Sequence, residues 1–164
     1  MSSLFNKKQV VILLIIVAAA IMRLLPHLPN MTPITAMALF SGVYFTNQKY
    51  AFFIPLLAMF LSDIVLGFSW DTLFVYASFI LVGYIGYTSK KIKITTILLS
   101  SISFFVITNF GSWLILYPKT LDGFLACYTA ALPFFRNSLI GDFVFSGLMY
   151  YGFEFISKRY LKTA

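Results

Sequence analysis

The sequence has few charged residues and almost no cysteine or histidine. Charged side chains make up 10% of the 164 residues, and only five of them are acidic. The one cysteine, Cys127, excludes an intrachain disulfide, and the one histidine, His27, leaves no spacing typical of a metal site. No phosphate-binding loop, dinucleotide-binding turn or nucleophile elbow occurs. We therefore expect no metal, no cofactor and no enzymatic activity.

Hydrophobic residues dominate what is present. They make up 60% of the chain, and the mean hydropathy is +0.91, far above the value typical of soluble domains. The net charge of +7 does not indicate nucleic-acid binding, because the Lys and Arg residues lie mostly in short loops between apolar runs. The composition therefore predicts an all-α integral membrane protein embedded in a lipid bilayer.

The apolar residues form six segments of helical length. At a rise of about 1.5 Å per residue, most of them are long enough to cross much of a bilayer core of about 30 Å. We expect the proline-rich stretch 26–33 to dip into the protein and the half-polar stretch 118–131 to connect the last two helices. This is a single transmembrane domain over residues 1–164, with helices at about 8–25, 34–45, 50–68, 70–87, 94–117 and 133–154.

The distribution of basic residues predicts the orientation of these helices. Loops on the cytoplasmic side carry an excess of Lys and Arg. If six helices cross and both termini are cytoplasmic, only Arg23, Lys119 and Arg136 lie outside. The residues that lie inside are then Lys7, Lys8, Lys49, Lys90, Lys91, Lys93, Lys158, Arg159 and Lys162.

In this orientation the polar groups at membrane depth fall in the outer leaflet. A charge at the bilayer centre costs about 2.5–3.5 kcal/mol, so such groups normally face a protein interior or a wet cavity. Their shared depth, together with nearby aromatics, predicts a small-molecule site. The predicted substrate-binding residues are Arg23, His27, Asn30, Asp63, Trp70, Asn109, Trp113, Arg136, Asn137 and Asp142.

Roles follow from the chemistry of these side chains. Arg136 and Asp142 are expected to anchor the substrate, with Asp63 as their counter-ion or as an acceptor. Amides orient a ligand by hydrogen bonds and indole rings stack on it. We therefore expect Asn109 and Asn137 to orient the substrate by hydrogen bonds, and Trp70 and Trp113 to stack on it.

Three other interpretations stay open at this point. The charged residues can form a structural ion network without a ligand. An integral membrane enzyme can use Asp63 and Asp142 as an acid and base pair, and a structural or assembly subunit needs no pocket. The small residues Ala38 and Gly42, four apart, allow another helix to approach closely, either within the bundle or from a partner.

Three blocks resemble a bacterial family of small six-helix membrane proteins regarded as transport proteins. They are RLLPHLPNMTPITAMALFSGVYF at 23–45, LLAMFLSDIVLGF at 56–68 and PFFRNSLIGDFVFSGLMYYG at 133–152. That family is similar to the substrate-binding S components of energy-coupling-factor (ECF) vitamin transporters. The resemblance implies a multi-pass protein of the bacterial inner membrane that takes up a vitamin-like or cofactor-precursor molecule.

The same resemblance implies a mechanism. S components bind substrate in an outward-facing site lined by the loops after helices one, three and five, here 26–33, 67–71 and 118–137. A membrane-embedded ECF coupling subunit and two cytoplasmic ATPases then topple the S component. This chain carries no ATPase motif, so active transport implies those partners. The small-residue docking motif of many S components is not cleanly present on the first helix.

Overall fold

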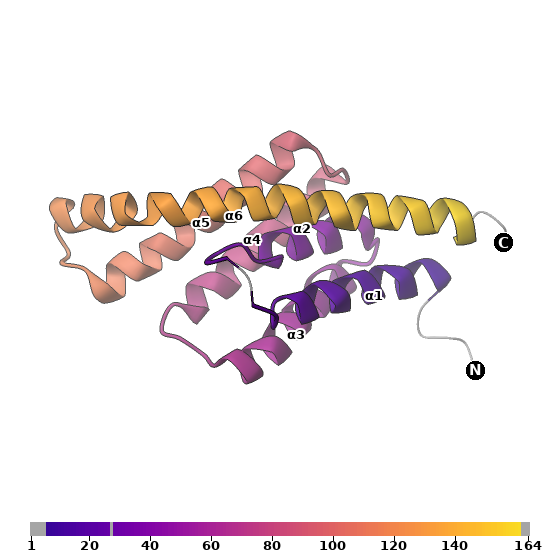
Figure 1. Ribbon diagram of the computed structural model, residues 1–164, viewed down its shortest axis with the longest axis horizontal. Coiled ribbons are helices and arrows are strands. Elements are labelled where there is room, and N and C mark those ends of the chain that lie inside the picture. Colours follow the sequence, from indigo (N-terminus) through magenta and orange to yellow (C-terminus); the bar gives the residue numbers. More distant parts are fainter. Residues whose placement is uncertain (1–5, 27, 162–164) are drawn as a thin grey trace.

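The structure is a computed structural model that describes residues 6–26 and 28–161. Within these ranges the chain is all helical, with no strand, which confirms the prediction of an all-α chain with six helices. A short π-helical turn, η1, follows the last helix (Figure 1). The elements are α1 Lys7–Met22, α2 Ile34–Tyr44, α3 Gln48–Leu66, α4 Thr72–Ser89, α5 Ile94–Leu116, α6 Leu121–Ile156 and η1 Ser157–Leu161.

Four helices, α3 to α6, are long and apolar enough to cross a membrane. The two N-terminal helices are shorter: α1 has 16 residues and α2 has 11. Helix α6 is the longest, and its 36 residues extend about 54 Å at 1.5 Å per residue, well beyond a hydrocarbon core of about 30 Å. In Figure 1 it runs the whole length of the molecule.

The predicted start of the last helix at residue 133 is wrong. Helix α6 begins at Leu121 and continues through Pro133. Its first turn is well formed, because Thr120 accepts a hydrogen bond from the Gly123 amide at 3.1 Å and Asp122 complements the helix dipole. A proline removes one backbone donor, whereas a break in lipid exposes several unsatisfied groups, so the helix persists. The stretch 118–131 is therefore mostly helix and not a connecting loop.

Helix α2 lies at the centre of the bundle and contacts all five other α-helices. Every residue from Thr35 to Gly42 is buried, whereas the apolar residues of the outer helices include many exposed ones. A helix that is hydrophobic on all sides is stable only when it is surrounded. The short length of α2 thus reflects its place inside the protein.

Close packing of α2 against α4 depends on glycine. A Cβ atom added to Gly42 would lie 2.2 Å from the carbonyl oxygen of Gly83, and one added to Gly86 would lie 2.5 Å from the carbonyl oxygen of Leu39. Such backbone contact is possible only between small residues. The small-residue surface at Ala38 and Gly42 therefore serves packing within the bundle.

The helices run alternately up and down. The start of α1 and the end of α6 lie at one end of the molecule, and the turn between α5 and α6 lies at the other (Figure 1). The junctions α1–α2, α3–α4 and α5–α6 therefore lie farther from the termini than the α2–α3 and α4–α5 junctions, and the α5–α6 turn lies farthest away (Figure 1). The polar residues singled out above belong to these segments.

The α2–α4 contact predicts opposite outcomes for two alanine substitutions. We expect Gly42→Ala to destabilise the protein by about 1–3 kcal/mol, because the added methyl group meets backbone atoms. Gly147→Ala on α6 is the control: nothing lies within 4 Å of its added Cβ, so helix propensity makes it neutral or slightly stabilising. Thermal unfolding in detergent measures both, and equal midpoints would contradict the packing described.

Candidate functional site

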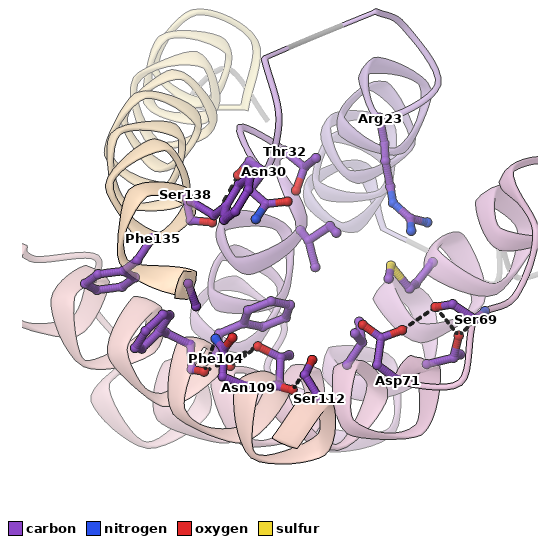
Figure 2. A pocket seen from close by; sticks show the side chains of 18 of the residues that line it. Arg23, Asn30, Thr32, Ser69, Asp71, Phe104, Asn109, Ser112, Phe135 and Ser138 are labelled. Atoms are coloured by element: carbon purple, nitrogen blue, oxygen red, sulfur yellow. Dashed lines mark hydrogen bonds between the residues drawn. The ribbon is translucent and has the colours of Figure 1, made fainter. Parts of the chain in front are cut away.

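A cavity of about 500 Å³ lies beside the ends of α1 and α3 and the starts of α2 and α4, with residues of α5 and α6 on its other side. Its wall, with the contacts that hold it in place, is formed by residues of all six α-helices and of the loops before α2 and α4 (Figure 2). The wall is both aromatic and polar, and it includes the charged residues Arg23, Asp63, Asp71 and Asp142. Such a cavity has the size and composition of a small-molecule site.

One side of the cavity is held by an ion pair between α1 and α3. Arg23 ends α1, and its Nη1 lies 2.6 Å from Oδ1 of Asp63. The two side chains are only 13% and 5% exposed, and Nη1 also donates to the hydroxyl of Ser62. Satisfying both charges inside the protein removes the cost of placing either one in lipid.

The other oxygen of Asp63 is also used. Tyr76 on α4 donates its hydroxyl proton to Asp63 Oδ2 at 2.8 Å, so one carboxylate joins α1, α3 and α4. This arrangement is the structural ion network considered above for Asp63 and Arg23. Both residues nevertheless line the cavity, so the network forms part of its wall.

Asp142 lies on the opposite side, on α6, and has a different environment. It is 2% exposed and lines the cavity. Its Oδ2 accepts a hydrogen bond from Ser101 Oγ of α5 at 2.6 Å, and the Thr35 side chain of α2 also bonds to it. In the ranges that the structure describes, no Lys or Arg forms a salt bridge with Asp142. The ion network considered above therefore does not extend to Asp142 there.

Helix α5 presents one continuous face to the cavity. Thr108 Oγ1 donates to the Phe104 carbonyl at 2.8 Å, and Asn109 Nδ2 donates to the Phe105 carbonyl at 2.8 Å. The sequence analysis predicted only Asn109 on this face. The other residues could have been predicted from their spacing of three and four, which places them on the same side of a helix as Asn109. The members of this face are Ser101, Phe104, Phe105, Thr108, Asn109 and Ser112.

The loop before α2 closes the cavity on the side of α6. Ser138 Oγ donates to the carbonyl oxygen of Asn30 at 3.1 Å, and Asn30 has a φ of 60°, a conformation that asparagine tolerates better than most residues. Asn30 and Thr32 lie opposite α5 in Figure 2. The predicted entry of this loop into the protein thus holds only for residues 31–33, where Met31 and Thr32 are partly buried and Pro33 is buried, whereas Asn30 is exposed.

The structure brings five of the ten predicted residues to one cavity. They come from five different parts of the chain, which supports their shared depth in the bundle. These residues are Arg23, Asn30, Asp63, Asn109 and Asp142.

Neither tryptophan forms the predicted stacking wall. Trp70 is 87% exposed and is not part of the cavity wall. Trp113 turns away from the cavity, because its Nε1 donates to the Pro118 carbonyl at 3.0 Å and its ring packs on Phe110 and Phe124, with centroids 5.5 and 5.4 Å apart. The aromatic part of the wall comes from phenylalanines instead.

Arg136 and Asn137 also lie off the cavity. Arg136 is exposed, and Asn137 Nδ2 donates to the Pro29 carbonyl at 3.2 Å. The reason is helical phase. In an unbroken α6 the cavity-lining residues recur at a spacing of three and four, and Arg136 and Asn137 fall on other faces. The cavity-lining residues of α6 are Ala131, Phe134, Phe135, Ser138 and Asp142. His27 lies outside the described residues.

The ion pair predicts a specific pattern of stability. Asp63→Ala leaves the Arg23 guanidinium without its partner at low exposure, and we expect a loss of about 3–5 kcal/mol. The double variant Arg23→Met, Asp63→Leu removes both charges and should recover most of that loss. Thermal unfolding in detergent tests this, and a double variant as unstable as the single one would contradict the role assigned to the pair.

Comparison with known proteins assigns the chain to a family. No curated protein and no solved structure matches it at a significant level. A family of unknown function, DUF6580, matches residues 3–163, which is nearly the whole chain. The protein therefore belongs to the DUF6580 family.

Proposed function

We propose that this protein binds a small molecule in the cavity and serves in its uptake across the bacterial cell membrane. The observation that carries the proposal is the cavity itself. It holds about 500 Å³, and aromatic and polar side chains from separate helices converge on it. Apolar walls supply burial, and a few placed polar groups fix orientation, which is how small-molecule sites are built.

The proposal includes six crossings with both termini in the cytoplasm. Among the described residues, eight basic side chains lie in segments at the end of the bundle that holds the termini, and three lie in segments at the cavity end. The excess of Lys and Arg marks the cytoplasmic side, so the cavity opens outward. Helix α2 has only 11 residues and is too short to cross alone.

The resemblance to S components supplies the substrate class and the partners. We propose a vitamin-like or cofactor-precursor substrate, with an ECF coupling subunit and cytoplasmic ATPases supplying the energy. The six helices and the cavity near the loops after α1 and α3 support this proposal. An acid and base pair is disfavoured, because the two oxygens of Asp63 contact Arg23 and Tyr76 and are not poised against Asp142.

Native mass spectrometry of the protein purified from its own membranes tests the function directly. We expect a bound small molecule in complex with the chain, together with a coupling subunit when gentle detergent is used. A protein that carries no small molecule, and that gains none when incubated with an extract of the growth medium, would contradict the proposal. Turnover of the bound molecule without any ATPase would favour an enzyme instead.

A pair of leucine substitutions on α5 tests the site. Ser112→Leu places a larger side chain in the cavity, so we expect at least tenfold weaker binding of the co-purified molecule. Ser103→Leu is the matched control, because Ser103 lies on the same helix and outside the cavity wall. Binding titrations by native mass spectrometry measure both. Equal affinities in the two variants would remove the α5 face from the site.

A further inference from the structure

Among the described charged side chains that line the cavity, acidic ones outnumber basic ones. Arg23 is the one basic residue among them, against Asp63, Asp71 and Asp142, which gives a formal net charge of −2. The Arg23 charge is already paired with Asp63 at 2.6 Å. Asp142 has hydroxyl partners and no salt bridge within the described residues. The cavity thus holds a buried carboxylate that no basic side chain in residues 6–26 and 28–161 neutralises.

The polar groups of α5 offer acceptors more than donors. A hydroxyl has one proton to donate, and once it is donated only the lone pairs remain for a ligand. The protons of Thr108 and Ser112 go to carbonyls of α5 itself. The Ser101 hydroxyl lies within hydrogen-bond distance of two acceptors of the protein, the Ile97 carbonyl and Asp142. The amide of Asn109 donates one proton to the Phe105 carbonyl, which leaves its oxygen as an acceptor and one N–H as a donor. A ligand on this face therefore meets more acceptors than donors.

Phenylalanine rings complete the wall. Phe104, Phe105, Phe134 and Phe135 all line the cavity, and the rings of Phe105 and Phe135 lie with centroids 4.5 Å apart. Phe104 and Phe135 lie on the α5 and α6 sides of the cavity in Figure 2. The face of an aromatic ring attracts a cation within about 6 Å of its centroid. Rings of this kind also give burial to a flat organic molecule.

From these observations we propose that the ligand is a small organic cation with several N–H donors, such as an amidinium or a protonated heterocyclic amine, anchored on the carboxylate of Asp142. This inference rests on the proposed function and names the substrate class of the same site. An unpaired buried carboxylate is costly, and a cationic ligand supplies the missing partner. The acceptors of α5 and the phenylalanine faces then select an organic cation.

Two other ligand classes fit less well. An anion would meet a net negative wall and would have to compete with Asp63 for Arg23. A metal ion needs several oxygen ligands within about 2–2.6 Å. The described residues hold no group of three or more metal-ligating side chains, and the cavity is far larger than an ion.

Isosteric probes that differ in charge test the inference. The probes are benzamidinium, benzamide and benzoate, with the naphthalene equivalents of each, added to the full chain in lipid nanodiscs and measured by native mass spectrometry. We expect the cations to bind at least tenfold more tightly than the neutral and anionic probes. Asp142→Asn should abolish this preference, whereas Asp122→Asn, an exposed carboxylate on the same helix and outside the cavity, should retain it.

The outcomes separate this inference from the proposed function. Tighter binding of neutral or anionic probes, or an unchanged cation preference in Asp142→Asn, would overturn the cation assignment and leave a binding site standing. If no probe binds, the charge of the co-purified molecule decides: a cation supports the assignment, and a neutral or anionic molecule overturns it. Absence of any bound molecule would overturn the proposed function itself. If Asp142→Asn does not stay monodisperse, Phe135→Leu replaces it, and it should weaken cation binding more than neutral binding.

Discussion

Lipid cannot solvate a charge, so every ionisable side chain at membrane depth needs a partner inside the protein. The Arg23–Asp63 pair meets this requirement at the cavity end of α1 and α3, and Tyr76 extends the contact to α4. Three helix ends are thereby fixed relative to one another. The wall of the cavity on this side depends on that arrangement, because the same two charged residues form part of it.

The opposite wall is built differently. Helices α5 and α6 form a long hairpin, and the cavity faces of both carry aromatic and polar residues at a spacing of three and four. The buried carboxylate of Asp142 is held there by hydroxyl groups and not by a basic side chain. The cavity therefore lies between a neutralised ion pair and a wall that combines a buried carboxylate with aromatic rings.

Between the two walls, α2 provides a rigid centre. Its buried residues contact every other α-helix, and Gly42 allows α4 to approach to backbone contact. A short helix enclosed in this way does not have to match the bilayer thickness. The preceding loop can then reach the cavity, where Asn30 and Thr32 join the wall.

Much of this architecture follows from the sequence alone. Long apolar runs bounded by charged or turn residues determine helices, so the expected and observed bounds of α2 and α5 agree within one residue. Apolar context also makes Arg23, Asp63 and Asp142 costly unless they face inward, and all three do.

Only the tertiary structure decided which polar residues line the same cavity. Which side chains face the cavity depends on the rotation of each helix about its axis, and the sequence does not give this rotation. Helix α6 is an example, because the sequence predicts that it starts at Pro133, whereas in the structure Pro133 lies inside it. Arg136 and Asp142 lie on one helix, yet only Asp142 reaches the cavity, because packing against α2 and α5 sets which face of α6 turns inward.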